Sequence, residues 1–262
     1  MNLKSAALLM ASLWMAAWIS PPATVASPLK PKAAEETPDI RRVALVIDDF
    51  GNDMQGTTQM MELSVPFAAA VMPFLPTTKR DAEWAHRIGQ TVLVHVPMEP
   101  NKGKPEWLGP GAITVNLTDE EVRQRIIAAI EDVPHAVGIN NHMGSKVTAD
   151  ERIMRIILTV CKEKGLFMLD SRTTDKSVVG KLAAELGVPT AANNMFMDDV
   201  YTRSHIAKQA VKLQKLAASQ PNTIVIGHVG APGKHTSDIL KQTIPSIQQA
   251  GAKFVPISEM MH

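Results

Sequence analysis

The chain has 262 residues, and its 27 lysine and arginine side chains nearly balance 26 aspartate and glutamate side chains, which leaves a formal net charge of +1 at pH 7. This balance, without a basic stripe interleaved with aromatic residues, argues against nucleic acid as a partner. Cys161 is the only cysteine, so the fold does not rest on disulfides and its stability must come from a hydrophobic core.

The first 26 residues have the features of a secretory signal peptide. A basic start, Met1–Lys4, precedes the apolar stretch Ala6–Ile19, which is shorter than the roughly 20 residues that span a bilayer. Small residues at Thr24–Ala26 offer a cleavage site. Cleavage would leave no transmembrane span and a periplasmic or secreted protein; an uncleaved N-terminal anchor is the alternative. Residues 27–39, rich in Pro, Ala, Lys and Glu, predict a flexible linker.

Residues 40–262 have the size of one α/β domain. Short apolar runs alternate there with amphipathic stretches at helical spacing, which predicts repeated βα units and a parallel sheet or barrel. Strands are expected at Val43–Ile47, Phe67–Val71, Thr91–Val94, Ala136–Ile139, Leu166–Leu169, Pro189–Ala192, Thr223–Gly227 and Lys253–Pro256. Helices are expected at Asp53–Leu63, Thr78–Ile88, Asp119–Ile130, Asp150–Lys164, Asp175–Leu186, Arg203–Ser219 and Thr236–Ala250.

Local signals mark several ends of these elements. Thr118 and Thr148 each stand three residues before a glutamate, which predicts capping boxes at two helix starts. Gly165 and Gly187 follow predicted helix ends, where a left-handed backbone is favoured. The irregular segment Pro97–Thr114, rich in Pro and Gly, is a candidate lid.

Polar side chains follow the strands at the ends where α/β active sites are built. In a parallel barrel all these ends open on one face, so residues far apart in the chain would meet there. Taken alone, each histidine has a structural explanation as a core, loop or strand-end residue. The residues are Asp48 and Asp49 after the first strand, His95 after the third, Asn140, Asn141 and His142 after the fourth, Asp170, Ser171 and Arg172 after the fifth, and His228 after the seventh.

Asp49, His95 and His142 are the candidate metal ligands, because one carboxylate and two imidazoles suit zinc or another divalent transition metal. Neighbouring strand residues point to opposite faces, so Asp48 and Asp49 can serve one site only if the strand ends in the turn toward Phe50 and Gly51. Asp49 would then bind the metal, and Asp48 would lie beside the water that the metal activates.

Several motifs resemble those of a known family. The residues Val-Ile-Asp48-Asp49-Phe-Gly resemble the first motif of NodB-type polysaccharide deacetylases. The segment Ile88–His95 is similar to their second motif, two histidines four residues apart, but has Thr91 in the first position, and Ile224–His228 is similar to the last motif. More closely, IDDFGND, HVPMEP, GINNHMGS and LDSRTT together resemble the divergent polysaccharide deacetylase family, from roughly Arg41 to the C-terminus.

The resemblance implies a single deformed (β/α)7–8 barrel over residues 40–262 and a metal-dependent hydrolase that removes N-acetyl or O-acetyl groups from a cell-envelope glycan or peptidoglycan-like substrate. Asp48 would act as the base and His228 as the acid, while His142 would supply the nitrogen that Thr91 lacks. The family's Arg-rich third and Asp-Trp fourth motifs are absent, and Asp170 stands near the place of the latter. Asp170 is therefore expected to orient His228 or a neighbouring group.

Substrate-binding candidates are Asn140, Asn141, Arg172 and Trp107. The two asparagines would bind substrate, orient a ligand by hydrogen bonds, or form a turn after the strand. Trp107 would be a platform for a sugar ring or simple loop cover. A non-catalytic metal- and glycan-binding envelope module on the same fold is an alternative function, and another metal-dependent hydrolase such as an amidase or phosphoesterase is a third. The sequence leaves the oligomeric state open.

Overall fold

The structure, a computed structural model, describes residues 40–262. The expected signal peptide and linker lie outside these described residues. The strands are β1 (Arg42–Phe50), β2 (Phe67–Val71), β3 (Thr91–Met98), β4 (Ala136–Met143), β5 (Phe167–Asp170), β6 (Thr190–Ala192), β7 (Met195–Phe196), β8 (Asn222–His228) and β9 (Lys253–Phe254). The helices are α1 (Thr57–Met61), α2 (Thr78–Arg87), α3 (Asp119–Asp132), α4 (Glu151–Lys164), α5 (Val179–Leu186), α6 (Arg203–Ser219) and α7 (Gly233–Gln249), with 3₁₀ turns η1 (Pro105–Trp107), η2 (Val147–Ala149) and η3 (Ile257–Met260).

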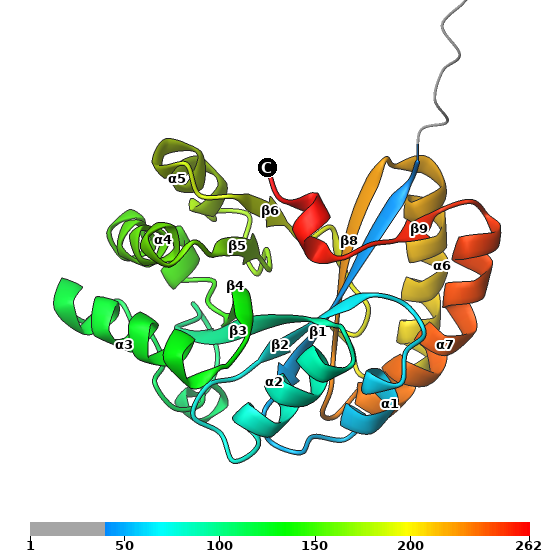
Figure 1. The fold of residues 1–262 in the computed structure, drawn as a ribbon, viewed down its shortest axis with the longest axis horizontal. Coiled ribbons are helices and arrows are strands. Elements are labelled where there is room, and N and C mark those ends of the chain that lie inside the picture. The colour runs from blue at the N-terminus through cyan, green and yellow to red at the C-terminus, as the bar shows by residue number, and fades with distance from the viewer. Residues whose placement is uncertain (1–39) are drawn as a thin grey trace, which may run out of the picture. The chain divides into compact units, whose positions relative to one another are not determined.

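The strands form one curled parallel sheet, and helices cover its outer face (Figure 1). The strand order is β6-β5-β4-β3-β2-β1-β8-β7, with β9 paired to the start of β1. Among the described strands, β6 and β7 are the two ends of this order, so the barrel stays open between them. The predicted parallel (β/α) architecture is confirmed. Within residues 40–262 we find no helix with the length and apolar character to cross a membrane.

Alternation along β1 divides the core into two layers. Val43, Leu45 and Ile47 belong to the large cluster that includes the helices, whereas Ala44 and Val46 belong to a smaller cluster inside the curled sheet. The inner cluster also holds Ile257 and Met260 of η3, so this turn fills the interior of the sheet. Both faces of the strands are therefore buried, which explains their nearly continuous apolar runs.

Several strands run further than predicted, and this changes where the polar residues lie. Main-chain pairing continues through Asp48, which is directly opposite His228 on β8, and His95 is opposite Asn140 in the pairing of β3 with β4. Asp48, Asp49, His95 and the 140–142 segment thus lie in the C-terminal halves of strands instead of after them. The prediction that the first strand stops before the two aspartates was wrong, because its hydrogen-bonded neighbours extend equally far.

The predicted helix ends are partly confirmed. Thr118 and Glu121 form the expected capping box, and Gly165 and Gly187 adopt the expected left-handed conformation at the ends of α4 and α5. The second capping box was wrong: Thr148 lies in η2, and the side chain of Asp150 accepts the hydrogen bond that starts α4. The first predicted helix shrinks to α1, since residues 53–56 form the turn that follows β1.

Candidate metal centre and active site

Asp48 and Asp49 reach the same pocket because the backbone is irregular at Asp49. Regular alternation would turn Asp49 toward the helices, on the same side as Ile47. Instead, Asp49 has a left-handed φ of +71°, and the pairing of β1 with β2 shifts register between Ile47 and Phe50. Bulges of this kind re-aim side chains next to active sites. Both carboxylates line one pocket of about 260 Å³.

The turn after the two aspartates depends on Gly51. Its φ is +118°, and a Cβ at this position would lie 2.8 Å from the carbonyl oxygen of Met72. The Gly51 N–H donates a 2.9 Å hydrogen bond to the buried carboxylate of Asp81, which also accepts a hydrogen bond from the Thr77 hydroxyl at 2.8 Å. This acceptor on α2 fixes the end of β1 and with it the position of Asp49.

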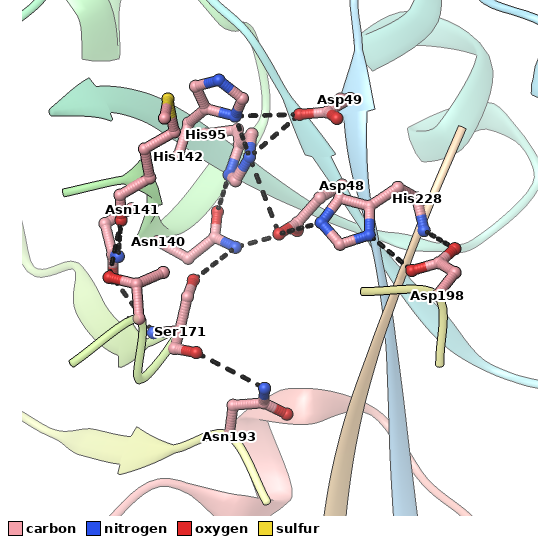
Figure 2. A network of polar contacts seen from close by, with 12 residues as sticks. Asp48, Asp49, His95, Asn140, Asn141, His142, Ser171, Asn193, Asp198 and His228 are labelled. Carbon is pink, nitrogen blue, oxygen red and sulfur yellow. Dashed lines mark hydrogen bonds and ion pairs between the residues drawn. The ribbon is translucent and has the colours of Figure 1, made fainter. Parts of the chain in front are cut away.

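Asp49, His95 and His142 converge as a ligand set (Figure 2). Asp49 Oδ1 lies 3.0 Å from His142 Nδ1 and 3.3 Å from His95 Nε2, and the two imidazole nitrogens are 3.2 Å apart. Despite these distances, the buried Oδ1 accepts no well-directed hydrogen bond. An orphaned buried carboxylate oxygen facing two imidazole nitrogens fits a divalent metal bound by all three. The residues predicted as ligands are thus brought together.

Asn140 links the ligand set to Asp48. His95 Nδ1 lies 2.8 Å from Asn140 Oδ1, and because an amide oxygen only accepts, this nitrogen carries the hydrogen. The lone pair of His95 Nε2 is then free to face a metal. The amide nitrogen of Asn140 donates to Asp48 Oδ1 at 2.9 Å. Asn140 is fully buried, so it orients two site residues and does not line the pocket.

The two aspartates have opposite electrostatic environments. Burial raises the pKa of Asp48 above its usual value, and the nearby imidazoles of His95 and His228 oppose this only in part. Burial acts in the same direction on Asp49, but the close imidazoles of His142, His95 and His228 outweigh it and hold the pKa of Asp49 well below its usual range. Asp49 therefore stays an anion, which is the form a metal ligand needs.

His228 faces Asp48 from the neighbouring strand and is oriented by Asp198 (Figure 2). His228 Nδ1 lies 2.7 Å from Asp198 Oδ1. Asp198 Oδ2 accepts hydrogen bonds from the main-chain N–H of His228 at 2.9 Å and from the Thr236 hydroxyl at 2.6 Å. Burial disfavours the imidazolium, but attraction to Asp198, Asp49 and Asp48 outweighs it and raises the pKa of His228 to about 10. Its Nε2 lies 4.0 Å from Asp48 Oδ2.

The residue that orients His228 is therefore Asp198, and the role expected for Asp170 was wrong with respect to His228. Asp170 Oδ1 accepts from the backbone N–H of Arg172 at 2.8 Å, and both residues line a neighbouring pocket beside α5. Sequence reasoning missed Asp198 because β7, which positions it, has only two residues. The available signal was a pair of aspartates shortly before Thr202, the N-cap of α6.

Other candidate residues lie at the edge of the site or outside it. The side-chain amide of Asn141 donates to the Met143 carbonyl at 2.7 Å and accepts from the Ser171 N–H at 3.0 Å. Asn141 therefore connects the end of β4 to the loop after β5. The indole of Trp107 is 59% exposed and does not line the pocket. Phe196 and Tyr201 supply the aromatic surface there, and neither was singled out from the sequence.

Thr91, which stands in the place of the first histidine of the resembled motif, does not lie at the candidate metal centre. Thr91 is the first residue of β3 and lines a different pocket, at the N-terminal end of the strands. His95 lies four residues further along the same strand, which corresponds to about 13 Å at 3.3 Å per residue. Two residues so far apart cannot share a metal, and His142 supplies the second imidazole.

Proteins of two bacteria are similar to this chain in sequence. An uncharacterized protein of Haemophilus influenzae is 32% identical over 215 residues, covering 82% of this chain and 72% of that protein. The Escherichia coli protein YibQ, also uncharacterized, is 32% identical over 203 residues, covering 78% of this chain and 62% of its own length.

Solved structures share the fold. An uncharacterized protein of Agrobacterium tumefaciens superposes with a TM-score of 0.77 at 18% identity, covering 84% of this chain and 89% of that chain. The Xyl-CE4 domain of a multidomain xylanase from the hindgut metagenome of Trinervitermes trinervoides superposes with a TM-score of 0.53 at 13% identity, with the same coverage of both chains. These similarities confirm the NodB-type deformed barrel. The sequence pattern of the family described as divergent polysaccharide deacetylase matches residues 45–261, and the chain therefore belongs to that family.

Proposed function

We propose that this protein is an exported, zinc-dependent deacetylase that removes N-acetyl or O-acetyl groups from a cell-envelope glycan. The proposal rests on Asp48 and His228, whose side chains face each other at 4.0 Å beside the ligand set. Neither residue belongs to that ligand set, so holding a metal does not explain why both are there. A hydrolase needs such a pair, a base for the attacking water and an acid for the leaving group.

Asp49, His95 and His142 would hold the zinc ion. A divalent zinc supplies Lewis acidity, which polarises an acyl carbonyl and lowers the pKa of water. Asp48 accepts the proton of the attacking water, and the hydrogen bond from Asn140 keeps its Oδ1 fixed so that Oδ2 faces the pocket. Hydrolysis at neutral pH thus depends on a carboxylate held in one orientation.

His228 donates a proton to the leaving amine or alcohol. Attraction to Asp198 raises the pKa of His228 and favours the protonated imidazole, and the bond to Asp198 directs Nε2 toward Asp48 and the pocket. The water proton and the leaving-group proton are therefore handled by residues on adjacent strands. Phe196 stacks on the imidazole at 6.0 Å between ring centroids and shields one side of it.

The size of the pocket suits one sugar unit of a longer glycan at a time. Its volume of about 260 Å³ is below the roughly 300–1,000 Å³ of pockets for drug-sized ligands. Tyr201 lies at the rim with 60% of its surface exposed, where a sugar ring can stack. Arg172 lines the neighbouring pocket and would contact a following sugar unit. Residues 1–26, as a signal peptide, would deliver the domain to such a glycan.

The test is acetate release from N-acetylated glycan fragments by zinc-loaded protein, compared with an Asp48→Asn variant. We expect the variant to retain zinc and to lose 10²-fold to 10⁴-fold in turnover, the usual contribution of a general base. Equal turnover of both proteins would reject Asp48 as the base. Glycan binding without acetate release by either protein would instead favour a non-catalytic envelope module.

A further inference from the structure

A main-chain carbonyl from the long loop after β3 reaches the candidate metal centre. This loop, residues 99–113, leaves and rejoins the sheet at one place: Met98 and Ile113 form a β-bridge, and the Glu99 N–H donates to the Ile113 carbonyl at 2.8 Å. Because its ends lie together, it is an Ω-loop. Its tip carries η1, which ends at Trp107.

The Trp107 carbonyl fixes the tautomer of a metal ligand. His142 Nε2 lies 3.0 Å from the Trp107 carbonyl oxygen, while His142 Nδ1 faces Asp49 Oδ1 at 3.0 Å. Because a carbonyl oxygen can only accept, Nε2 carries the hydrogen and Nδ1 keeps its lone pair. The imidazole is thereby held at both nitrogens, one inside the ligand set and one on the loop.

The indole of Trp107 has a different environment from its carbonyl. Its ring is exposed, and the Lys104 ammonium group lies 5.9 Å from the ring centroid. Asn101 anchors the loop to Ser145. Its main-chain N–H donates to the Ser145 hydroxyl and its side-chain amide donates to the Ser145 carbonyl, each at 2.9 Å. What Trp107 contributes to the metal centre is therefore its main chain.

We infer that the 99–113 loop is an outer part of the metal centre, in which the Trp107 carbonyl positions His142, so that zinc binding and ordering of the loop favour each other. The inference rests on the proposed zinc site. An acceptor on the non-ligating nitrogen of a ligand histidine typically changes metal affinity by about 10-fold to 100-fold. By thermodynamic reciprocity, zinc orders the loop as much as the ordered loop strengthens zinc binding.

The first experiment separates the carbonyl from the indole. In one variant, residues 103–109 are replaced by two glycines, which removes the Trp107 carbonyl. In the matched control, Trp107→Ala, the carbonyl remains and only the indole is lost. Zinc affinity is measured by competition with a chromophoric chelator. We expect about 10-fold to 100-fold weaker binding in the shortened loop and an affinity within about threefold of wild type in Trp107→Ala.

Hydrogen exchange on the unaltered protein gives an independent measurement. Zinc should slow amide exchange in residues 102–110 and leave the connection around Gly89, at the other end of β3, unchanged. Wild-type zinc affinity in the shortened loop, or equal losses in both variants, would overturn the inference while leaving the zinc site in place. Absence of zinc binding by the wild-type protein would overturn the proposed function as well.

Discussion

Replacing Asp198 by asparagine should remove the pH dependence that His228 gives to folding. Asp198 is fully buried, and its two oxygens accept hydrogen bonds from His228 Nδ1, the His228 N–H and the Thr236 hydroxyl. Asparagine has nearly the same shape without the charge. The substitution therefore removes the largest attraction that opposes the burial of the imidazolium while it leaves the packing in place.

The magnitude follows from the pKa of His228, which is about 10 in the folded protein against 6.5 for the unperturbed group. Because the folded state binds the proton more tightly, the stabilisation is complete below about pH 6.5 and is lost as the pH rises through about 10. At 1.36 kcal/mol per pKa unit, wild-type protein should lose roughly 2–3 kcal/mol of unfolding free energy between pH 7 and 9. Asp198→Asn should lose most of this slope.

The assay is urea unfolding at pH 6, 7, 8 and 9 in the presence of a chelator, because a bound dication would itself repel the imidazolium. His228→Gln, which has no titrating group at this position, is the matched comparison and should give the same profile as Asp198→Asn. The slope that remains in both variants belongs to His95, whose burial lowers its pKa but whose attraction to Asp48 and Asp49 raises it further. A wild-type slope retained in Asp198→Asn would refute the assignment of the shift to Asp198. A flat profile in the wild-type protein would refute a protonated His228.

Three further predictions concern the metal centre. Asp49→Ala should abolish zinc retention and the zinc-dependent rise in melting temperature, and an unchanged zinc content would contradict its role as a ligand. Asn140→Ala should weaken zinc binding by about 10-fold to 100-fold, measured by chelator competition, because it orients His95; wild-type affinity would refute this. Gly51→Ala should lower the melting temperature, since its Cβ would lie 2.8 Å from the Met72 carbonyl oxygen; calorimetry showing no loss would refute this.

The ligand set was predictable because a parallel sheet brings the ends of its strands to one face. Asp49, His95 and His142 come from three strands and meet as expected. The turn at Asp49 was foreseen as a requirement, yet its form was not, since a bulge inside a continuing strand leaves no mark in an apolar run.

What could not be predicted lies in short or irregular segments. Two residues of β7 are too few for a periodic pattern, so Asp198, which follows them, had no predicted strand to place it. Thr91 and His95 lie in one strand, where four residues span far more distance than in a helix, so a second imidazole has to come from another strand. The 99–113 loop contacts the metal centre through a carbonyl, a group that every residue carries.

If Asp48 and His228 act as the proposed base and acid, their direct pairing across β1 and β8 would separate the reaction rate from substrate specificity. The distance between the proposed proton acceptor and proton donor would be determined by the hydrogen-bonded spacing of two central strands, about 4.8 Å, and not by any loop. Loops around the rim can then lengthen, shorten or exchange aromatic residues without disturbing the proton-transfer geometry. Relatives with the same strand pairing would be free to diverge in the glycan they accept while the acid–base pair stays the same.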